Sequence, residues 1–169
     1  LSDRRQRQMC IRDSLKSGKP VKLVMTRDEV FKATGPTVSS SMDVKIGMTK
    51  DGIITAGEAH LRYQGGAFPN GTVEMGAQSA FAAYDLKSVR TKGWNVLTNR
   101  PKQAAYRAPG APQAIYAVES VVDELCQKLN LDPLEIRIKN AAKKGTKSSY
   151  GPTFDDIGLI ATLEAVSYT

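Results

Sequence analysis

Hydrophobic and polar residues alternate along three regions of the chain, and this alternation predicts β-strands. Residues 19–27 (KPVKLVMTR) and residues 89–99 (VRTKGWNVLTN) each fit a single strand. Residues 39–64 fit a long hairpin, because two alternating runs flank Asp51-Gly52, a dipeptide typical of tight turns. A glycine-rich break at residues 65–71 follows the hairpin.

A helical period replaces the alternation in the second half of the chain. The apolar residues of segment 115–129 recur on one helical face, and Asn130 is expected to end that helix. A second helix is expected to begin with Asp132 as its N-cap and Pro133 at its first position, and to run to about Ala142. Shorter helices are predicted at residues 27–35, 72–85 and 154–168.

The order of these elements predicts an α+β fold of mixed sheets packed with helices, because strands and helices occur in blocks instead of regular alternation. A chain of 169 residues, 41% hydrophobic and 24% charged, fits one globular domain with a buried core. No apolar run approaches the roughly 20 residues of a membrane span. The lack of a disulfide framework indicates a reducing, cytoplasmic compartment.

The first fourteen residues are expected not to belong to the natural protein. Residues 4–14 (RRQRQMCIRDS) match, codon by codon, a reading frame through a transposase-type sequencing-library adaptor. A natural basic N-terminal arm is the alternative explanation. We therefore expect residues 1–14 to be an adaptor artefact and residues 15–169 to be an incomplete domain from inside a longer protein.

Few residues of the chain could form a catalytic or metal site. Cys10, Cys126 and His60 are its only cysteines and histidine, which leaves no Cys/His metal cage. His60 lies in an alternating stretch and is expected to be a surface residue or one with its hydrogen bonds satisfied, whereas Cys126 is expected to be a small buried hydrophobic residue. Glu119 and Asp123 lie one helical turn apart on a polar face, where solvated carboxylates explain them better than a catalytic pair does.

A nucleic-acid-binding domain is one alternative function, because the net charge is +7. The two helices joined by residues 129–135 (LNLDPLE) could mimic a helix-turn-helix, with Arg137 and Lys139 near phosphates. The basic residues are otherwise scattered, and a proline-capped junction is ordinary in a helical hairpin. We therefore expect no nucleic-acid partner.

The segment Arg107-Ala108-Pro109-Gly110-Ala111-Pro112-Gln113 is the strongest candidate for a functional site. The prolines fix backbone angles, Gly110 allows a close approach, and a helix begins near Pro112. Free N–H groups at the start of a helix and the guanidinium of Arg107 could together bind anionic oxygens. The alternative is a rigid crossover in which Arg107 stacks on Tyr106 or pairs with a carboxylate.

Residues 105–145, beginning AYRAPGAPQAIYAVESVVDEL, resemble the molybdopterin-binding large subunit of the xanthine dehydrogenase and aldehyde oxidase family of molybdenum hydroxylases. Residues 18–35 (GKPVKLVMTRDEVFKATG) resemble that family's strand after its glycine-rich cofactor loop. Residues 41–68 resemble its next hairpin. The resemblance therefore covers nearly all of the chain from Gly18 onward, and it implies that the chain is part of a larger molybdopterin-binding subunit.

The resemblance also implies site residues. The family's arginine at the position of Arg107 lies beside the molybdenum centre, and the adjoining loop backbone faces cofactor and substrate. Arg107 and Ala108 are therefore expected to bind the cofactor, and Pro109 to line the substrate pocket. The purine-oxidising branch has phenylalanine at the position of Pro109, and the carbon-monoxide-oxidising branch has a modified cysteine at that of Ala108. Neither activity is therefore expected here.

The implied reaction is hydroxylation of aldehydes, aromatic N-heterocycles or related aromatic compounds with oxygen derived from water. Molybdopterin is the expected cofactor, with iron–sulfur clusters and FAD on partner subunits or domains, in an assembly such as a dimer of heterotrimers. The family's catalytic glutamate follows the position of Thr169. No catalytic residue or metal ligand is therefore expected in this chain, which should be inactive alone. A non-catalytic homologue that only scaffolds partners is the other alternative.

Overall fold

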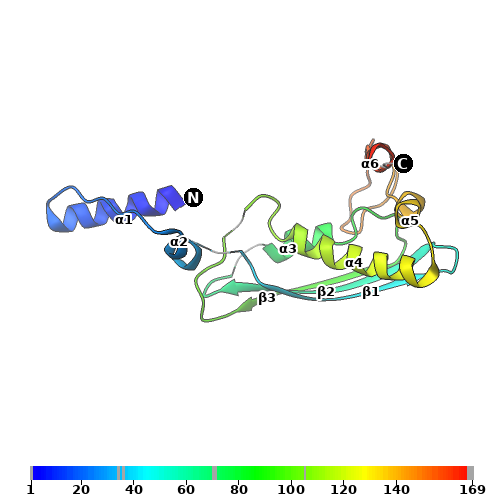
Figure 1. Ribbon diagram of the computed structural model, residues 1–169, viewed down its shortest axis with the longest axis horizontal. Coiled ribbons are helices and arrows are strands. Elements are labelled where there is room, and N and C mark those ends of the chain that lie inside the picture. The colour runs from blue at the N-terminus through cyan, green and yellow to red at the C-terminus, as the bar shows by residue number, and fades with distance from the viewer. Residues whose placement is uncertain (1, 34, 36, 70–71, 105, 167–169) are drawn as a thin grey trace.

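A three-stranded sheet lies at the centre of the computed structural model, which describes residues 2–33, 35, 37–69, 72–104 and 106–166 (Figure 1). Its strand order is β1-β2-β3, with the strands β1 (Ser40–Met48), β2 (Ile54–Gly66) and β3 (Val89–Leu97). β1 pairs antiparallel with β2, whereas β3 pairs parallel with β2. The sheet is therefore mixed, and the predicted α+β class is confirmed.

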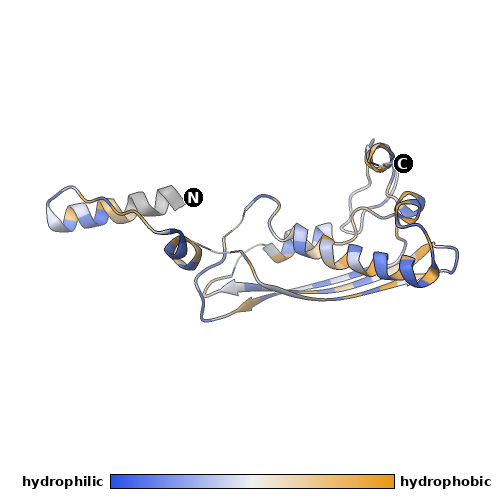
Figure 2. Cartoon of the chain, viewed as in Figure 1, coloured by the Kyte–Doolittle hydropathy of each residue, from blue (hydrophilic) through white to orange (hydrophobic). Residues whose placement is uncertain are grey.

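The hairpin forms where the alternation predicts it. Val44 lies opposite Ala59, and hydrophobic and hydrophilic residues follow one another along the strands in Figure 2. The turn closes through the N–H of Thr49, which donates to the carbonyl of Ile53 over 2.9 Å, and Gly52 takes a φ of 83°. Glycine adopts this left-handed conformation without steric cost, so the Asp-Gly signal marks the turn correctly.

Two helices, α3 (Thr72–Ser79) and α4 (Ala111–Leu129), cover one face of the sheet (Figure 1). α4 turns Val118, Val122 and Cys126 inward, and all three side chains are fully buried. They meet the sheet residues Leu61 and Tyr63 in the main core cluster. Burying side chains of this size stabilises the fold by roughly 1.5–3 kcal/mol for each large one, and Cys126 is the buried hydrophobic residue that the sequence predicts.

The junction after α4 also follows the sequence. Asn130 ends α4 in the left-handed conformation, with a φ of 54°. The side chain of Asp132 then accepts hydrogen bonds from the N–H groups of Leu134 and Glu135 over 2.8 Å, and α5 (Pro133–Asn140) begins. This capping satisfies N–H groups that have no partner within the helix. α5 ends at Asn140, slightly before the predicted end at Ala142.

Arg137 ties the two helices of this junction together. Its guanidinium lies 2.8 Å from the carboxylates of Glu119 and Asp123 on α4. The hydroxyl of Tyr84 donates to the Glu119 carboxylate over 2.8 Å, and burial, reinforced by the charge of Glu119, raises the pKa of Tyr84 strongly. Glu119 and Asp123 are thus partners of one arginine, and Arg137 is engaged within the fold instead of facing a phosphate backbone.

The strand predicted at residues 19–27 is wrong. The alternation is visible, because Val21, Leu23 and Met25 are half-buried between more exposed neighbours, but no strand partner occurs within the described residues. A strand requires a second backbone for its hydrogen bonds, which alternation alone does not provide. The segment links α1 (Ser2–Ser17) to α2 (Arg27–Ala33), and both helices lie apart from the sheet in Figure 1.

The other helices lie where they are predicted and are shorter over the described residues, whereas residues 34, 167 and 168 of the predicted segments lie outside the described part of the chain. α2 occupies the segment predicted at residues 27–35, where Thr26 and Glu29 form a reciprocal capping box. α3 ends at Ser79 instead of continuing to Asp85, and α6 (Leu159–Ala165) is the final helix. No helix in the described part of the chain is both long and apolar enough to cross a membrane.

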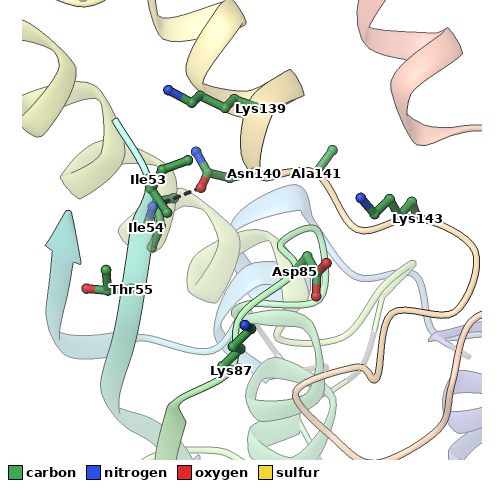
Figure 3. A pocket seen from close by; sticks show the side chains of 9 residues that line it. All are labelled: Ile53, Ile54, Thr55, Asp85, Lys87, Lys139, Asn140, Ala141 and Lys143. Carbon is green, nitrogen blue, oxygen red and sulfur yellow. Dashed lines mark hydrogen bonds between the residues drawn. The ribbon is translucent and has the colours of Figure 1, made fainter. Parts of the chain in front are cut away.

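Asn140 joins α5 to the hairpin turn (Figure 3). Its side-chain oxygen accepts the N–H of Ile54 over 2.8 Å, and its amide nitrogen donates to the carbonyls of Gly52 and Ile136, each over 2.8 Å. All of these groups lie away from water, where an unsatisfied partner is costly. One buried amide therefore fixes the turn end of the sheet against α5.

We expect Asn140→Ala to lower the free energy of unfolding by about 2–4 kcal/mol, because it leaves the N–H of Ile54 and the carbonyl of Gly52 without partners. Urea denaturation of the purified protein measures this change. Gln127→Ala, at an exposed position of α4, is the matched control and should change stability by less than about 0.5 kcal/mol. Equal stability of the two variants would contradict the anchoring role of Asn140.

Candidate functional site

The segment that carries the candidate residues forms a tight turn at the start of α4. Ala108 and Gly110 both take left-handed conformations, with φ of 56° and 78°, on either side of Pro109. The N–H of Ala111 donates to the carbonyl of Ala108 over 3.2 Å and closes the turn. A non-glycine residue in this conformation costs about 1–3 kcal/mol, and such residues gather at functional sites. Ala108 is therefore held in place by its surroundings.

Those surroundings are the centre of the sheet and α3. The hydroxyl of Tyr63 donates to the carbonyl of Gly110 over 2.6 Å, in a fully buried position. A Cβ atom on Gly110 would lie 2.2 Å from the carbonyl oxygen of Thr72, and a Cβ on Gly76 would lie 2.2 Å from the Tyr63 hydroxyl. Strand β2, helix α3 and the turn thus meet at a distance that only glycines allow.

Burial raises the pKa of Tyr63 to about 12, and the neighbouring Tyr106 adds to the shift. Desolvation has this effect because it disfavours the charged phenolate. Tyr63 is consequently a neutral hydrogen-bond donor throughout the physiological pH range.

The turn brings the predicted site residues together. Arg107 and Ala108 are exposed, and Pro109 is half-buried beside them. Within the described part of the chain, Arg107 forms no ion pair with a carboxylate and no cation–π contact with Tyr106. The contacts expected for a purely structural arginine therefore do not occur there, and the guanidinium presents its donors to the outside.

The start of α4 offers fewer free donors than the sequence predicts. The N–H of Ala111 is bonded to the turn, and Pro112 has no N–H. The N–H of Ala114 donates to the carbonyl of Gly110 over 3.4 Å. Pro112 and the Ala111 bond thus remove two of the predicted donors, so attraction of an anion depends mainly on Arg107.

An apolar hollow of about 560 Å³ lies next to the turn, between β1 and α4. The amide nitrogen of Gln113 donates to the Tyr106 hydroxyl over 3.3 Å, and its buried oxygen has no hydrogen-bond partner among the described residues. The sequence gives no sign of this hollow, because its walls come from distant segments. It is lined by Ser40, Met42, Tyr106, Pro112, Gln113, Tyr116 and Ala117.

A second hollow, of about 410 Å³, lies between the start of β2 and the end of α5 and is drawn in Figure 3. Lys87, Lys139 and Lys143 line it together with Asp85, and Lys139 already donates to the carbonyl of Asp51. None of the described residues that line it belongs to α4 or to the Arg107 turn, so this hollow is separate from the one beside the turn.

We expect Gly110→Ala to lower the free energy of unfolding by more than about 2 kcal/mol, because it adds a steric clash with Thr72 to the backbone strain. Gly145→Ala is the matched control. Gly145 has a φ of +87° and no atom within 4 Å of the position that a Cβ would take, so this change costs only the backbone term of about 1 kcal/mol. Urea denaturation distinguishes the two, and equal losses would show that the clash is relieved by a small shift.

Comparisons with known proteins show the family to which the chain belongs. The family model of the molybdopterin cofactor-binding domain matches residues 6–141. The nicotinate dehydrogenase large molybdopterin subunit of Eubacterium barkeri is 33% identical over 150 residues, which cover 86% of this chain and 35% of that subunit. The chain thus spans about a third of the length of this relative.

Solved structures give the same result. Aldehyde oxidoreductase from Desulfovibrio gigas superimposes with a TM-score of 0.83 at 31% identity, covering 91% of this chain and 17% of that enzyme. Quinoline 2-oxidoreductase from Pseudomonas putida 86 superimposes with a TM-score of 0.82 at 23% identity, over 90% of this chain and 21% of that protein, and shows the fold. The chain therefore belongs to the molybdopterin cofactor-binding domain family, that of the xanthine dehydrogenase and aldehyde oxidase type of molybdenum enzyme.

Proposed function

We propose that this chain is part of the molybdopterin-binding subunit of a molybdenum hydroxylase, and that its Arg107 turn faces the cofactor and the substrate. One observation carries the proposal: an exposed guanidinium without an acidic partner among the described residues stands beside the strained backbone of Ala108, on a turn anchored to the core. Strain of this kind persists where a precise backbone position is useful.

The residues of the turn fit an anionic, oxygen-rich cofactor. Arg107 supplies a positive charge with several donors in one plane, and the small side chain of Ala108 leaves the backbone open to close approach. When bound, molybdopterin supplies the redox chemistry for hydroxylating an electron-poor carbon with oxygen derived from water. Arg107 and Ala108 would hold the cofactor side of the site, and Pro109 would form part of the substrate wall.

The turn itself orients and polarises but does not accept protons. Neither a carboxylate nor a histidine belongs to residues 107–113, so a catalytic base must come from another part of the subunit. The permanently charged guanidinium can stabilise negative charge that develops on an oxygen of the substrate or cofactor. This role requires Arg107 to be held at a fixed distance, which the rigid turn provides.

We propose aldehydes or aromatic N-heterocycles as substrates. Relatives described as an aldehyde oxidoreductase and a nicotinate dehydrogenase support this range. Ala108 and Pro109, which resemble neither the carbon-monoxide-oxidising nor the purine-oxidising branch, support it further. The proposal includes iron–sulfur and flavin partners, a higher assembly such as a dimer of heterotrimers, and a cytoplasmic location. A nucleic-acid-binding role is less favoured, because Arg137 is engaged with Glu119 and Asp123.

We expect Arg107→Ala in the full-length holoenzyme to lower kcat/KM by about a hundredfold or more, because one preorganised charged donor is lost. Aldehyde and N-heterocycle oxidation are assayed with a dye as electron acceptor, and bound molybdenum is measured in the same samples. Arg90→Ala is the matched control, since Arg90 is an exposed arginine on β3 whose nearest carboxylate, Glu58, is 3.8 Å away.

Turnover of Arg107→Ala equal to that of the Arg90→Ala control would remove Arg107 from the site. A full-length protein that binds no molybdenum would instead favour the non-catalytic scaffold. Preferred oxidation of purines or carbon monoxide in the same assay would contradict the proposed substrate range.

A further inference from the structure

We propose that the hydroxyl of Tyr63 is a positioning group for this reaction: it holds the carbonyl of Gly110 and so fixes where Arg107 and Ala108 stand. This inference rests on the proposed function of the Arg107 turn. Tyr63 acts through the backbone and not on the substrate, because its side chain is fully buried.

Tyr63 lies on the central strand of the sheet, where its backbone is held on both sides. Within β2 it is paired with Ser40 of β1 on one side and Asn95 of β3 on the other. A residue with strands on both sides cannot shift without breaking both ladders. The backbone that carries the phenol ring is therefore held in place, and the ring extends from the sheet to the turn.

The hydrogen bond from Tyr63 is short, and it joins two residues that are far apart in sequence. The Tyr63 hydroxyl lies 2.6 Å from the carbonyl oxygen of Gly110, 47 residues away in sequence. The same oxygen accepts the N–H of Ala114 over a longer distance of 3.4 Å. Because the shorter bond is the stronger one, the Tyr63 hydroxyl is the main restraint on this carbonyl.

Packing leaves the hydroxyl little freedom to move. A Cβ on Gly76 would come within 2.2 Å of the hydroxyl oxygen and within 3.0 Å of the Gly110 carbonyl oxygen. The hydroxyl and the carbonyl are thus enclosed together against the backbone of α3. A phenylalanine ring would fit the same space, so the hydroxyl can be removed without disturbing the packing.

The restraint passes along the turn to the site residues. Gly110 is followed at once by α4, and Pro109 before it has a fixed φ. Fixing the Gly110 carbonyl therefore also fixes the path of the backbone at Ala108. Without the bond, Ala108 can relax from its left-handed conformation, and Arg107 moves with it.

The test uses Tyr63→Phe in the full-length holoenzyme, with Tyr84→Phe as the matched control. Tyr84 is also a buried tyrosine, but its hydroxyl donates to Glu119 near the other helix junction. Hydrogen exchange at the N–H groups of Ala111 and Ala114 reports the order of the turn without any reaction. Molybdenum content, kcat and KM are measured on the same preparations.

We expect Tyr63→Phe to speed hydrogen exchange at Ala111 and Ala114 by up to about tenfold, which corresponds to the net free energy of one buried hydrogen bond. We expect kcat to fall at least about tenfold while molybdenum content stays unchanged, because orientation is lost and the cofactor is still retained. Tyr84→Phe should leave exchange at the turn and kcat near wild type, even where it lowers the melting temperature.

The readouts separate this inference from the proposed function. Unchanged exchange in Tyr63→Phe overturns the positioning role, whatever the activity. Faster exchange with wild-type kcat, while Arg107→Ala is impaired, also overturns it and leaves the proposed function standing. Wild-type turnover in Arg107→Ala removes the Arg107 turn from the site, and Tyr63 is then a structural contact only; absence of bound molybdenum in the wild-type protein overturns the proposed function itself.

Discussion

The packing of one face of α4 against the sheet determines the position of both ends of that helix. Val118, Val122 and Cys126 are fully buried, and the helix cannot slide or rotate without exposing them. Its first residue therefore lies over the central strand beside the Arg107 turn, and its last lies over the hairpin end beside α5. Hydrophobic burial supplies the energy, while the Tyr63 hydrogen bond selects the geometry of the turn before α4, and Asn140 fixes the hairpin turn against α5.

Local sequence signals predicted most of the fold. The Asp51-Gly52 turn and the Asp132-Pro133 helix start depend on neighbouring residues, so both could be located from the order of amino acids alone. The segment at residues 19–27 has an equally clear alternation but forms no strand in the described part of the chain. The difference is physical, because a turn or cap satisfies its own hydrogen bonds and a strand depends on a distant partner.

The candidate site divides in the same way. Arg107 and its turn could be identified from proline and glycine spacing and from the family resemblance, whereas the partners that hold the turn could not. In the sequence, Tyr63 looks like an ordinary core residue of a strand. Gly76 gives a signal, because a glycine within a helix indicates close packing. The expected row of free N–H groups was also smaller than predicted, since Pro112 and the Ala111 bond remove two of them.

The long sequence separation of the Tyr63–Gly110 bond has a consequence for folding. Contacts between distant residues close large loops and form late, after the local hairpin and helices have appeared. The Arg107 turn therefore reaches its final shape only when β2, α3 and α4 have all come together. In the proposed function, the cofactor would bind at a turn that exists only after these three elements have packed, so a partly folded subunit would not bind it.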